Sequence, residues 1–346
     1  MKIFYGVQGT GNGHITRARM MAKALYEADF DVTFQFSGRP AEHYFDMEIF
    51  NGYQVKQGMT FNTHKGKVSY WKTALQANAI RFIKDINSLD LSAYDCVISD
   101  YEPITAWAAK RQKKPVIGIG HQYAFNHAIP RKGADPIANQ VMKHFAPADI
   151  GIGLHWHHFG LPILPPIIDT PHTPSETQAQ KIVVYLPFED QEDVQRHLSA
   201  FTDFEFHVYA PQPIASKHPH ITFKPLSRDG FQKDLYDCAG IISNAGFELA
   251  SESLQLGKKI LAKPLHAQME QISNAAALEQ LGYGHTMFDF DAKVIEAWLH
   301  NPRAVRVTYP NVAKVLVQWL LDGTPVMDGA FIERIWQDVE VLSVEC

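Results

Sequence analysis

Short apolar runs alternate with amphipathic stretches along most of this chain. In its first half the runs lie at residues 2–8, 31–36, 96–99 and 116–119, and helical patterns separate them at residues 15–28, 71–89 and 105–112. After residue 180 the alternation restarts, with runs at residues 181–186, 204–209, 221–224, 240–243 and 260–262. Strands and helices repeated in this order are typical of crossover units and parallel strands. The sequence therefore predicts an α/β fold with two open parallel sheets.

A proline-rich segment separates the two series. Prolines stand at positions 162, 165, 166, 171 and 174. Because proline cannot donate to the ladder of a central strand, this segment is typical of a linker that holds at most an edge strand. The chain also has 346 residues, more than the roughly 150 residues of a usual domain. These two features together predict two domains.

We place the predicted domains on either side of this linker. Rossmann-like domains are expected at residues 1–165 and 180–325, joined by the linker at residues 166–179. The end of the chain has helical patterns at residues 305–321 and 330–341. A C-terminal helix within residues 326–346 is expected to cross back to the first domain.

The composition limits the partners and the location of the protein. Its net charge of -5 at pH 7 lacks the basic excess of a nucleic-acid-binding protein. The three cysteines, Cys96, Cys238 and Cys346, lie far apart, which suggests neither a disulfide framework nor a zinc cluster. The sequence has no signal-peptide pattern and nothing near the roughly 20 apolar residues of a membrane span. We therefore expect a cytoplasmic protein, for which any membrane contact would be peripheral, at the inner face.

A glycine-rich loop, Gly-Thr-Gly-Asn-Gly-His at residues 9–14, follows the first apolar run. Gly11 and Gly13 allow a tight turn and close approach of the backbone, and the helix that begins at Ile15 offers free amides to an anion. The third glycine stands one place early for the dinucleotide fingerprint, and no acidic residue ends the second strand. The loop therefore predicts a phosphate or anion site and argues against a dehydrogenase.

Three titratable residues follow strands at the edge where this site is expected. His14 begins the helix after the first strand, and Asp100 and Glu102 come directly after the run at residues 96–99. Each is a candidate general base toward an acceptor hydroxyl, because open α/β sheets bind ligands at the carboxyl ends of their strands. His14 could instead orient the loop or bind a phosphate. Asp100 or Glu102 could instead orient His14, and Asp100 could also cap the helix predicted at residues 105–112.

Polar side chains also end the next strand, as His121, Gln122 and Tyr123. They could line the same cleft, or they could be satisfied polar groups at the rim of the sheet. We expect the loops at residues 57–69 and 123–135 to shape an acceptor site.

Two motifs have residue types that bind metals. His155 and His157 would face the same side of a strand, but no third ligand is identifiable. Asp289 and Asp291 form a DxD pair, but a helical pattern follows directly, which favours capping by Asp291. We therefore predict no metal site.

The most informative stretch lies in the second half, at residues 240–284. A strand ends just before Asn244, a turn passes through Gly246, and a helix then runs to Gly257. The amides at Gly246 and Phe247 would open this helix. They could hold a diphosphate, whose charge the helix dipole stabilises.

Further along, three side chains could bind hydroxyl groups. Glu252, about two turns into the helix, could accept both hydroxyls of a ribose, and Glu270 and Gln271 at the next helix start could bond sugar hydroxyls. Singly, Glu252 could also be a solvated helix residue, and Glu270 could compensate a helix dipole. As an ordered set they favour ligand binding.

This ordered set resembles the donor-binding region of GT-B glycosyltransferases. Among them it is similar to the lipid II-forming N-acetylglucosaminyltransferase of peptidoglycan synthesis and to its less characterised bacterial and archaeal relatives. The resemblance covers residues 240–284 and the loop at residues 9–14, and extends to the rest only as architecture. It implies that Gly246 and Phe247 approach the nucleotide diphosphate.

The resemblance also implies roles for the residues further along. Glu252 falls on the family's ribose-binding glutamate, and Glu270 and Gln271 fall on its paired polar residues, with Asn274 on the asparagine that follows. The chain departs from the lipid II enzyme at residues 186–190, where Leu-Pro-Phe-Glu-Asp replaces a glycine and polar loop. A second phosphate contact is therefore in doubt there. Glu270 also replaces a glutamine, which would change the hydroxyls that are recognised.

The resemblance implies a GT-B fold, in which two Rossmann-like domains face a cleft, and a metal-independent hexosyltransferase activity. The donor would be a nucleotide sugar, most often UDP-linked in this family, bound as a substrate with no cofactor. The acceptor would be a hydroxyl of a glycan, a lipid-linked molecule or a small molecule, as in the synthesis of cell-envelope glycans or glycolipids. One alternative is a UDP-sugar 2-epimerase, which shares the fold and needs no acceptor. Another is a noncatalytic nucleotide-sugar-binding protein.

Overall fold

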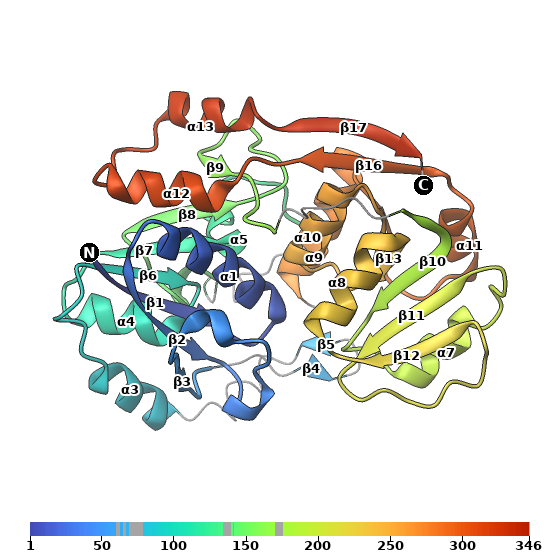
Figure 1. The fold of residues 1–346 in the computed structure, drawn as a ribbon, viewed down its shortest axis with the longest axis horizontal. Helices are drawn as coiled ribbons and strands as arrows, with labels where there is room; N and C mark the ends of the chain where they lie inside the picture. Colours follow the sequence, from blue (N-terminus) through green and yellow to red (C-terminus); the bar gives the residue numbers. More distant parts are fainter. Residues whose placement is uncertain are drawn as a thin grey trace.

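The computed structural model describes residues 1–59, 63–64, 67–68, 79–133, 140, 142–169, 176–266 and 268–345. These residues form two parallel sheets, of seven and six strands, and two ribbons of two strands each. Figure 1 shows the two sheets side by side, the first in blue and green and the second in green to orange. The predicted α/β fold with two parallel sheets is therefore confirmed.

Strand β1 (Lys2–Gln8) lies inside the first sheet, whose order is β3-β2-β1-β6-β7-β8-β9. The other strands are β2 (Asp31–Ser37), β3 (Gln54–Lys56), β6 (Cys96–Asp100), β7 (Val116–Gly120), β8 (Ile150–Leu154) and β9 (Ile163–Leu164). The helices of this half are α1 (Asn12–Glu27), α3 (Ala79–Ser88), α4 (Pro103–Arg111) and α5 (His121–Ala124), with 3-10 turns η1 (Ala41–His43) and η2 (Glu48–Phe50). Residues 3–8 of β1 are all buried, which explains why the first apolar run of the sequence is continuous rather than alternating.

Strand β10 (Gln178–Tyr185) has the same position inside the second sheet, whose order is β12-β11-β10-β13-β14-β15. The other strands are β11 (Glu205–Ala210), β12 (Ile221–Pro225), β13 (Cys238–Ser243), β14 (Lys259–Ala262) and β15 (His285–Thr286). Its helices are α7 (Gln191–Leu198), α8 (Arg228–Asp237), α9 (Phe247–Leu256), α10 (Met269–Leu281) and α11 (Ala292–Leu299). Most consecutive strands of both sheets are therefore joined by crossover helices.

Each sheet has a switch point beside its first strand. β1 lies between β2 and β6, β10 lies between β11 and β13, and all four pairings are parallel. Open α/β sheets bind ligands at such points, outside the carboxyl ends of the strands. The loop after Gln8 and the turn after Ser243 both begin at these ends. The two predicted glycine turns therefore lie where a ligand site is expected.

The end of the chain has strands where the sequence pattern predicts only helix. α12 (Val312–Leu321) and α13 (Gly329–Trp336) are helices, but β16 (Arg303–Thr308) and β17 (Glu340–Glu345) pair as an antiparallel ribbon. The prediction of helix at residues 305–308 and 340–341 is therefore wrong, because cross-strand pairing satisfies the backbone there instead. Trp336 Nε1 donates a 2.7 Å hydrogen bond to Ile163 O of the first half, and Figure 1 shows α12 and α13 lying over that half. The domain limits stay predictions.

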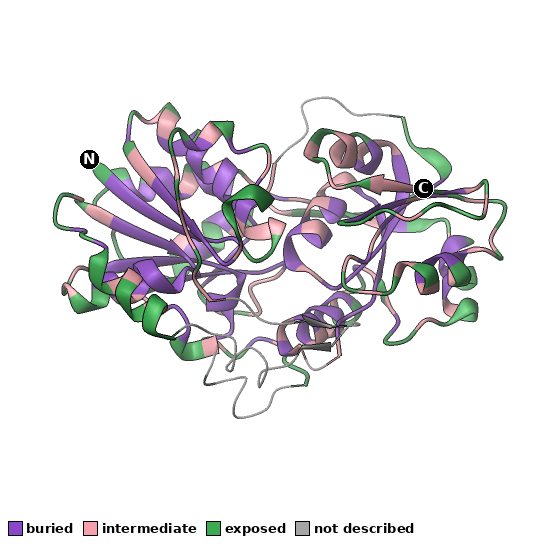
Figure 2. Ribbon diagram, turned by 90° about the horizontal axis from the view of Figure 1, so that it is seen from below, coloured by how far each residue is buried: buried purple, intermediate pink, exposed green. Residues whose placement is uncertain are grey.

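One apolar cluster runs through both halves of the molecule. It includes Ile98 of the first sheet and Ile241 of the second, together with Trp156 and Phe247. Trp156 is fully buried, and its indole nitrogen donates a 2.8 Å hydrogen bond to Ser251 Oγ of α9. Figure 2 shows buried residues along both sheets and on the helices between them. The two halves therefore contact each other through packed side chains.

Several predicted segments fall partly outside the described residues. Residues 60–62, 65–66, 69 and 134–135 of the expected acceptor loops lie outside them, as do residues 71–78 of a predicted helix and residues 170–175 of the predicted linker. Residues 63–64 and 67–68 form β4 (Thr63–His64) and β5 (Lys67–Val68), an antiparallel pair. Across the described ranges, no helix has the length and apolar character needed to cross a bilayer.

Candidate active site

A cavity of about 530 Å³ lies between the carboxyl ends of the two sheets. Its volume is in the range of small-molecule sites. The predicted site residues that line it are Gly11, Gly13, His14, Asn244, Gly246, Phe247, Glu252, Glu270 and Gln271. The structure therefore brings together in one cavity residues that the sequence separates by more than 200 positions. The remaining three, Asp100, Glu102 and Asn274, are buried and do not line it.

Three helices of eight or more residues begin at this cavity without a side-chain cap, and the one-turn helix α5 also lacks one. The N-cap residues of α1, α9 and α10 are Gly11, Gly246 and Gln268, and none of them makes a side-chain cap hydrogen bond. By contrast, a side chain caps each of α4, α7, α8, α11, α12 and α13. Uncapped amides and the positive ends of three helix dipoles therefore meet at the cavity. This arrangement favours an anionic ligand.

Glycine leaves room for a ligand at two of these helix starts. A Cβ atom added to Gly11 would meet nothing within 4 Å, and one added to Gly246 would meet only Asn244 O, at 4.0 Å. At Gly13, by contrast, glycine is required by close packing between two helices. A Cβ atom there would lie 2.7 Å from Glu248 Cγ, so its absence lets α1 pack against α9.

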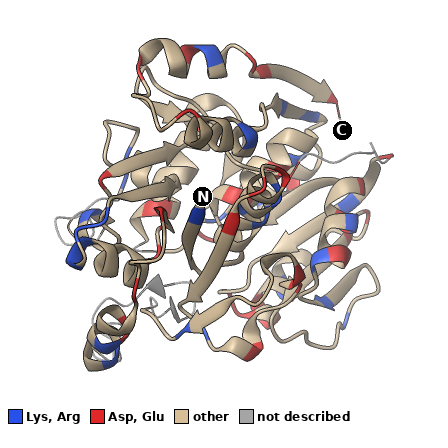
Figure 3. Cartoon of the chain, turned by 60° about the vertical axis from the view of Figure 1, so that its left-hand side comes forward, with Lys and Arg blue, Asp and Glu red and all other residues tan. Residues whose placement is uncertain are grey.

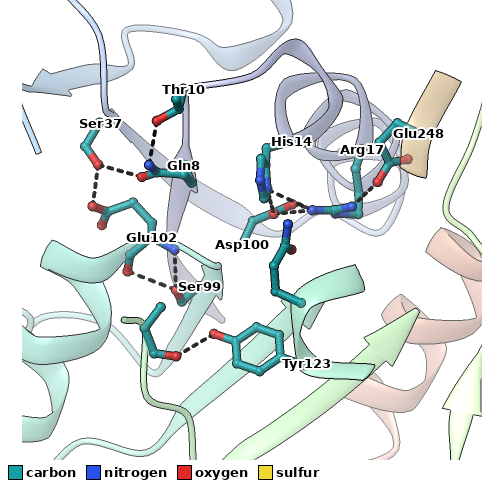
Figure 4. A network of polar contacts seen from close by, with 12 residues as sticks. Gln8, Thr10, His14, Arg17, Ser37, Ser99, Asp100, Glu102, Tyr123 and Glu248 are labelled. Carbon is teal, nitrogen blue, oxygen red and sulfur yellow. Dashed lines mark hydrogen bonds and ion pairs between the residues drawn. The ribbon is translucent and has the colours of Figure 1, made fainter. Parts of the chain in front are cut away.

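His14 and Asp100 form a hydrogen-bonded pair at the N-terminus of α1. His14 Nδ1 lies 2.7 Å from Asp100 Oδ1, and Figure 4 shows this contact beside Arg17. Arg17 Nη2 is 2.9 Å from the same nitrogen, but the ring nitrogen has one in-plane site, which we assign to the shorter contact with the carboxylate. Nδ1 then donates to Asp100, and the other ring nitrogen, Nε2, is free to accept a proton.

Arg17 holds the carboxylate of Asp100 from its other side. Arg17 Nε donates to Asp100 Oδ2 at 2.8 Å and Arg17 Nη2 to Oδ1 at 2.5 Å, and Asp100 is fully buried. Burial alone would raise the pKa of Asp100, but the charge of Arg17 and the hydrogen bond from His14 outweigh it and hold the pKa below its ordinary value. Asp100 is therefore ionised beside His14 at neutral pH.

The same arginine reaches the second half of the molecule. Arg17 Nη1 donates to Glu248 Oε1 in the first turn of α9, and Arg17 is 1% exposed (Figure 4). Burial raises the pKa of Glu248 to about 8, against the opposing effect of Arg17. Arg17 thus joins the histidine–aspartate pair of one half to a helix that begins at the cavity in the other half.

Glu102 caps a helix and does not line the cavity. Its carboxylate caps α4, accepting from Ile104 N at 2.9 Å and from Thr105 N at 2.7 Å, and Ser37 Oγ donates to it at 2.5 Å. The alternative in which Asp100 caps this helix is therefore wrong. Asp100 ends strand β6, two residues before the cap, and its carboxylate is taken up by His14 and Arg17.

Phe247 and Asn274 link the two halves beside the cavity. Phe247 stacks on His121, with ring centroids 4.1 Å apart and planes 3° from parallel. His121 Nε2 lies 2.7 Å from Asn274 Oδ1, and Asn274 Nδ2 donates to Ala245 O at 3.0 Å. Asn274 therefore supports the turn that precedes α9 from behind the cavity wall.

Two further carboxylates line the cavity. Burial, with a smaller contribution from Asp169, raises the pKa of Glu252 to about 7. Glu270 accepts from Gln122 Nε2, which is 3.2 Å from both of its carboxylate oxygens. Gln271 Oε1 accepts a 2.9 Å hydrogen bond from the amide of residue 265. Glu252 lies on α9 and Glu270 on α10, so each of the two uncapped helices of the second half brings one carboxylate to the cavity.

Two residues of this site, Arg17 and Glu248, are not among those that the sequence patterns predict. A local signal for Arg17 existed, because a residue three positions after His14 lies on the same helix face. Glu248 has no such signal, since an acidic residue in a first turn usually only compensates the helix dipole. Of the polar residues predicted after β7, Gln122 lines the cavity with His121, whereas Tyr123 is buried and donates to a backbone carbonyl.

The charges of the molecule are mixed in sign, with arginines gathered at the cavity. Figure 3 shows acidic and basic positions spread over both halves. Four arginines line the cavity, Arg17, Arg19, Arg39 and Arg228. Among the described residues no group of three or more His, Cys, Asp or Glu could hold a metal ion. Asp291 caps α11 by accepting from Lys293 N at 2.8 Å, as its sequence context predicts.

A family model described as glycosyl transferase family 1 matches residues 1–302. A search of curated proteins found no match.

Similar folds occur among solved structures. UGT89C1 of Arabidopsis thaliana, complexed with UDP, has a TM-score of 0.61 and 8% identity, covering 97% of this chain and 98% of that one. MurG of Acinetobacter baumannii has a TM-score of 0.54 and 15% identity, with 93% and 99% covered. The glycosyltransferase SnogD of Streptomyces nogalater has a TM-score of 0.52 and 14% identity, with 97% and 99% covered. At these identities the likeness shows the fold, which is the GT-B arrangement of two facing parallel sheets.

Proposed function

Because this chain belongs to glycosyl transferase family 1, we propose that it moves a hexosyl group from a UDP-sugar to a hydroxyl acceptor. The observation that carries this proposal is the pairing of two features across one cavity. A histidine–aspartate pair from the first half faces the uncapped start of α9 from the second half. The histidine–aspartate pair can remove a proton from the acceptor, and the free amides of α9 can stabilise a departing diphosphate.

The donor would bind mainly to the second half. Its diphosphate would lie at the amides of Gly246 and Phe247, with the loop at Gly11 opposite, and Glu252 would accept the ribose hydroxyls. Glu270 and Gln271 would lie near the sugar. The open space at Gly11 and Gly246 supports this placement. Helix amides and dipoles would stabilise the leaving diphosphate, so we propose a metal-independent reaction.

His14 would act as the general base. In the proposed step the acceptor oxygen bonds to the anomeric carbon while the bond from that carbon to the diphosphate breaks. His14 Nε2 takes the hydroxyl proton, and Asp100 stabilises the imidazolium that forms. Asp100 would not be the base itself, because it is fully buried and does not line the cavity.

A relation to the lipid II-forming enzyme is the finer proposal. The ordered residues from Asn244 to Asn274 and the likeness in fold to MurG support it. An acceptor from cell-envelope synthesis would fit that relation. With a lipid-linked acceptor, contact with the inner face of the membrane would be peripheral.

A screen of nucleotide sugars tests the donor. A selective donor should raise the melting temperature of the chain by mass action, and UDP release with glycan, lipid-linked and small-molecule hydroxyl acceptors would then identify transfer. No shift with any nucleotide sugar would contradict the proposal. A new sugar isomer formed from donor alone would instead identify a 2-epimerase, and tight binding with no turnover would identify a binding protein.

A further inference from the structure

A buried tryptophan of the first half reaches the start of α9 through one serine hydroxyl. Trp156 lies two residues after β8, and its Nε1 donates a 2.8 Å hydrogen bond to Ser251 Oγ. Ser251 Oγ in turn donates to Phe247 O at 2.7 Å. Trp156 and Ser251 are both 0% exposed, and neither lines the cavity. Any effect of this pair on a ligand must therefore pass through the backbone of α9.

The direction of both hydrogen bonds follows from the groups involved. An indole nitrogen only donates, and a backbone carbonyl only accepts. The hydroxyl of Ser251 therefore accepts from Trp156, and its single proton is directed at Phe247 O. These three groups form a relay that begins in the first half of the molecule and ends on the first carbonyl of α9.

The carbonyl at the end of this relay belongs to the same peptide group as the amide of Glu248. A hydrogen bond to the oxygen of a peptide group polarises that group and makes its N–H a stronger donor. Glu248 is the second residue of α9, so its N–H is among the four amides of the helix start that no helix carbonyl pairs. Phe247 and Glu248 both line the cavity, and α9 has no side-chain cap. The relay therefore strengthens an amide that is available to an anion.

Ring packing holds the same turn in place. Phe247 stacks on Trp156 with ring centroids 5.2 Å apart, and on His121 with centroids 4.1 Å apart. Both of these partners come from the first half, whereas Phe247 comes from the second. The start of α9 therefore cannot rotate or slide against the first half without losing these contacts and the relay.

We propose that Trp156 and Ser251 are positioning residues, which set the orientation and the donor strength of the α9 amides that hold the departing diphosphate. This inference rests on the proposed function. It makes the diphosphate site of the second half depend on a side chain of the first half. It also explains a hydroxyl at residue 251, because an alanine there would leave the indole N–H of Trp156 buried without an acceptor.

Calorimetry with UDP tests the inference on two matched serines of α9. Ser251→Ala should weaken UDP about three- to tenfold. Ser253→Ala is the control, because Ser253 is equally buried and its Oγ also donates to the carbonyl four residues earlier, Leu249 O, at 2.7 Å. That carbonyl shares its peptide group with the amide of Ala250, which is paired within the helix. Ser253→Ala should therefore change the Kd of UDP less than about twofold.

A second pair of variants tests the tryptophan. Trp156→Phe removes the indole N–H and keeps an aromatic ring, and it should weaken UDP at least about threefold. In the Ser251→Ala background it should have no further effect, because the members of a relay act in series. Trp319→Phe is the control, since Trp319 is buried and its Nε1 donates to Pro325 O at 2.7 Å without lining the cavity. Circular dichroism and melting temperatures check the folding of each variant.

Two results would overturn the inference. One is an equal change in the Kd of UDP for Ser251→Ala and Ser253→Ala, and the other is full additivity of Ser251→Ala and Trp156→Phe. Because Ser251→Ala removes a single oxygen atom, it decides the question by itself if Trp156→Phe does not fold. Absence of UDP binding to the wild-type chain would instead contradict the proposed donor, and the inference with it.

Discussion

Arg17 of α1 and Glu248 of α9 form a buried hydrogen-bonded contact that joins the two halves of the molecule beside the cavity. The guanidinium also binds Asp100 through two nitrogens, so one side chain contacts the partner of the proposed base and the helix of the proposed donor site. A buried charge of this kind is stable only while its partners remain in place. The geometry of the proposed base therefore depends on how the two halves pack.

Replacing Arg17 should change the pH dependence of the reaction. In Arg17→Gln the burial of Asp100 is no longer offset by a cation, so the pKa of Asp100 rises and its ionised form is lost at a higher pH. We expect the acid limb of the kcat/KM profile to move upward. Arg17→Lys keeps the charge but cannot bridge both carboxylates, and should give an intermediate profile. Arg196→Gln, at an arginine that is 67% exposed, is the control. Superimposable profiles for all four proteins would exclude this role of Arg17.

Removing the proposed base should abolish turnover and spare donor binding. His14→Ala should lower kcat by about 10²- to 10⁴-fold while the Kd of UDP changes only a few-fold, because the imidazole addresses the acceptor proton. Asp100→Asn should also lower kcat, because one acceptor oxygen becomes an NH₂ donor that faces a donor of Arg17 or His14, and the charge that stabilises the imidazolium is lost. Steady-state kinetics and calorimetry measure the two effects. A kcat for His14→Ala within about threefold of the wild-type value would contradict the assignment.

Donor affinity should depend on the ionisation of Glu252. Ribose hydroxyls donate best to a carboxylate, and the pKa of this group is raised to about 7. The affinity for UDP-glucose should therefore rise about tenfold between about pH 6 and about pH 8. UDP-glucose is the right probe because it lacks the terminal phosphate that titrates near pH 6. Glu252→Gln should remove this pH dependence, and Glu252→Ala should weaken binding at every pH. An unchanged Kd in both variants would show that Glu252 does not contact the donor.

Glu252 also predicts how stability changes with pH. Its pKa is raised from 4.5 to about 7 in the folded chain, so between these values the folded chain keeps a proton that the unfolded chain has lost. The free energy of unfolding should therefore fall as the pH rises through this window. Urea unfolding at about pH 5 and about pH 8 should show a smaller fall for Glu252→Gln than for the wild-type chain. If the free energy of unfolding decreases equally in the wild-type chain and in Glu252→Gln, the protonation of Glu252 does not contribute to the pH dependence of stability.

Glu102 provides a test of structural against catalytic roles. Glu102→Ala removes the cap of α4 and leaves buried donors unpaired, so we expect the free energy of unfolding to fall by about 1–3 kcal/mol. The folded fraction should keep a kcat/KM within about twofold of the wild-type value, because the carboxylate does not line the cavity. Thermal unfolding and kinetics on the same preparation measure both. A normal melting temperature with a large loss of kcat would reverse this assignment.

The predicted fold was largely correct because periodicity reports local structure. Continuous apolar runs and glycine turns predicted β1, β2, β6, β7 and β10 to β14 and the turns before α1 and α9, but not the short strands β3 and β15. The tail was misread at residues 305–308 and 340–341, since a strand in a two-stranded ribbon depends on a partner far along the chain. The cap of α4 was also ambiguous in the sequence, because Asp100 and Glu102 are both acidic and both precede the helix.

By itself, the sequence determined the α/β class, the two parallel sheets and the turns at which a ligand site would form, because these follow from the spacing of apolar residues and glycines over short stretches. Only the tertiary structure decided which side chains meet there. Asp100 and Arg17 are 83 residues apart and Arg17 and Glu248 are 231 apart, so no local pattern relates them. Packing of one half against the other brings them together, and burial then shifts the pKa values that local sequence leaves undetermined.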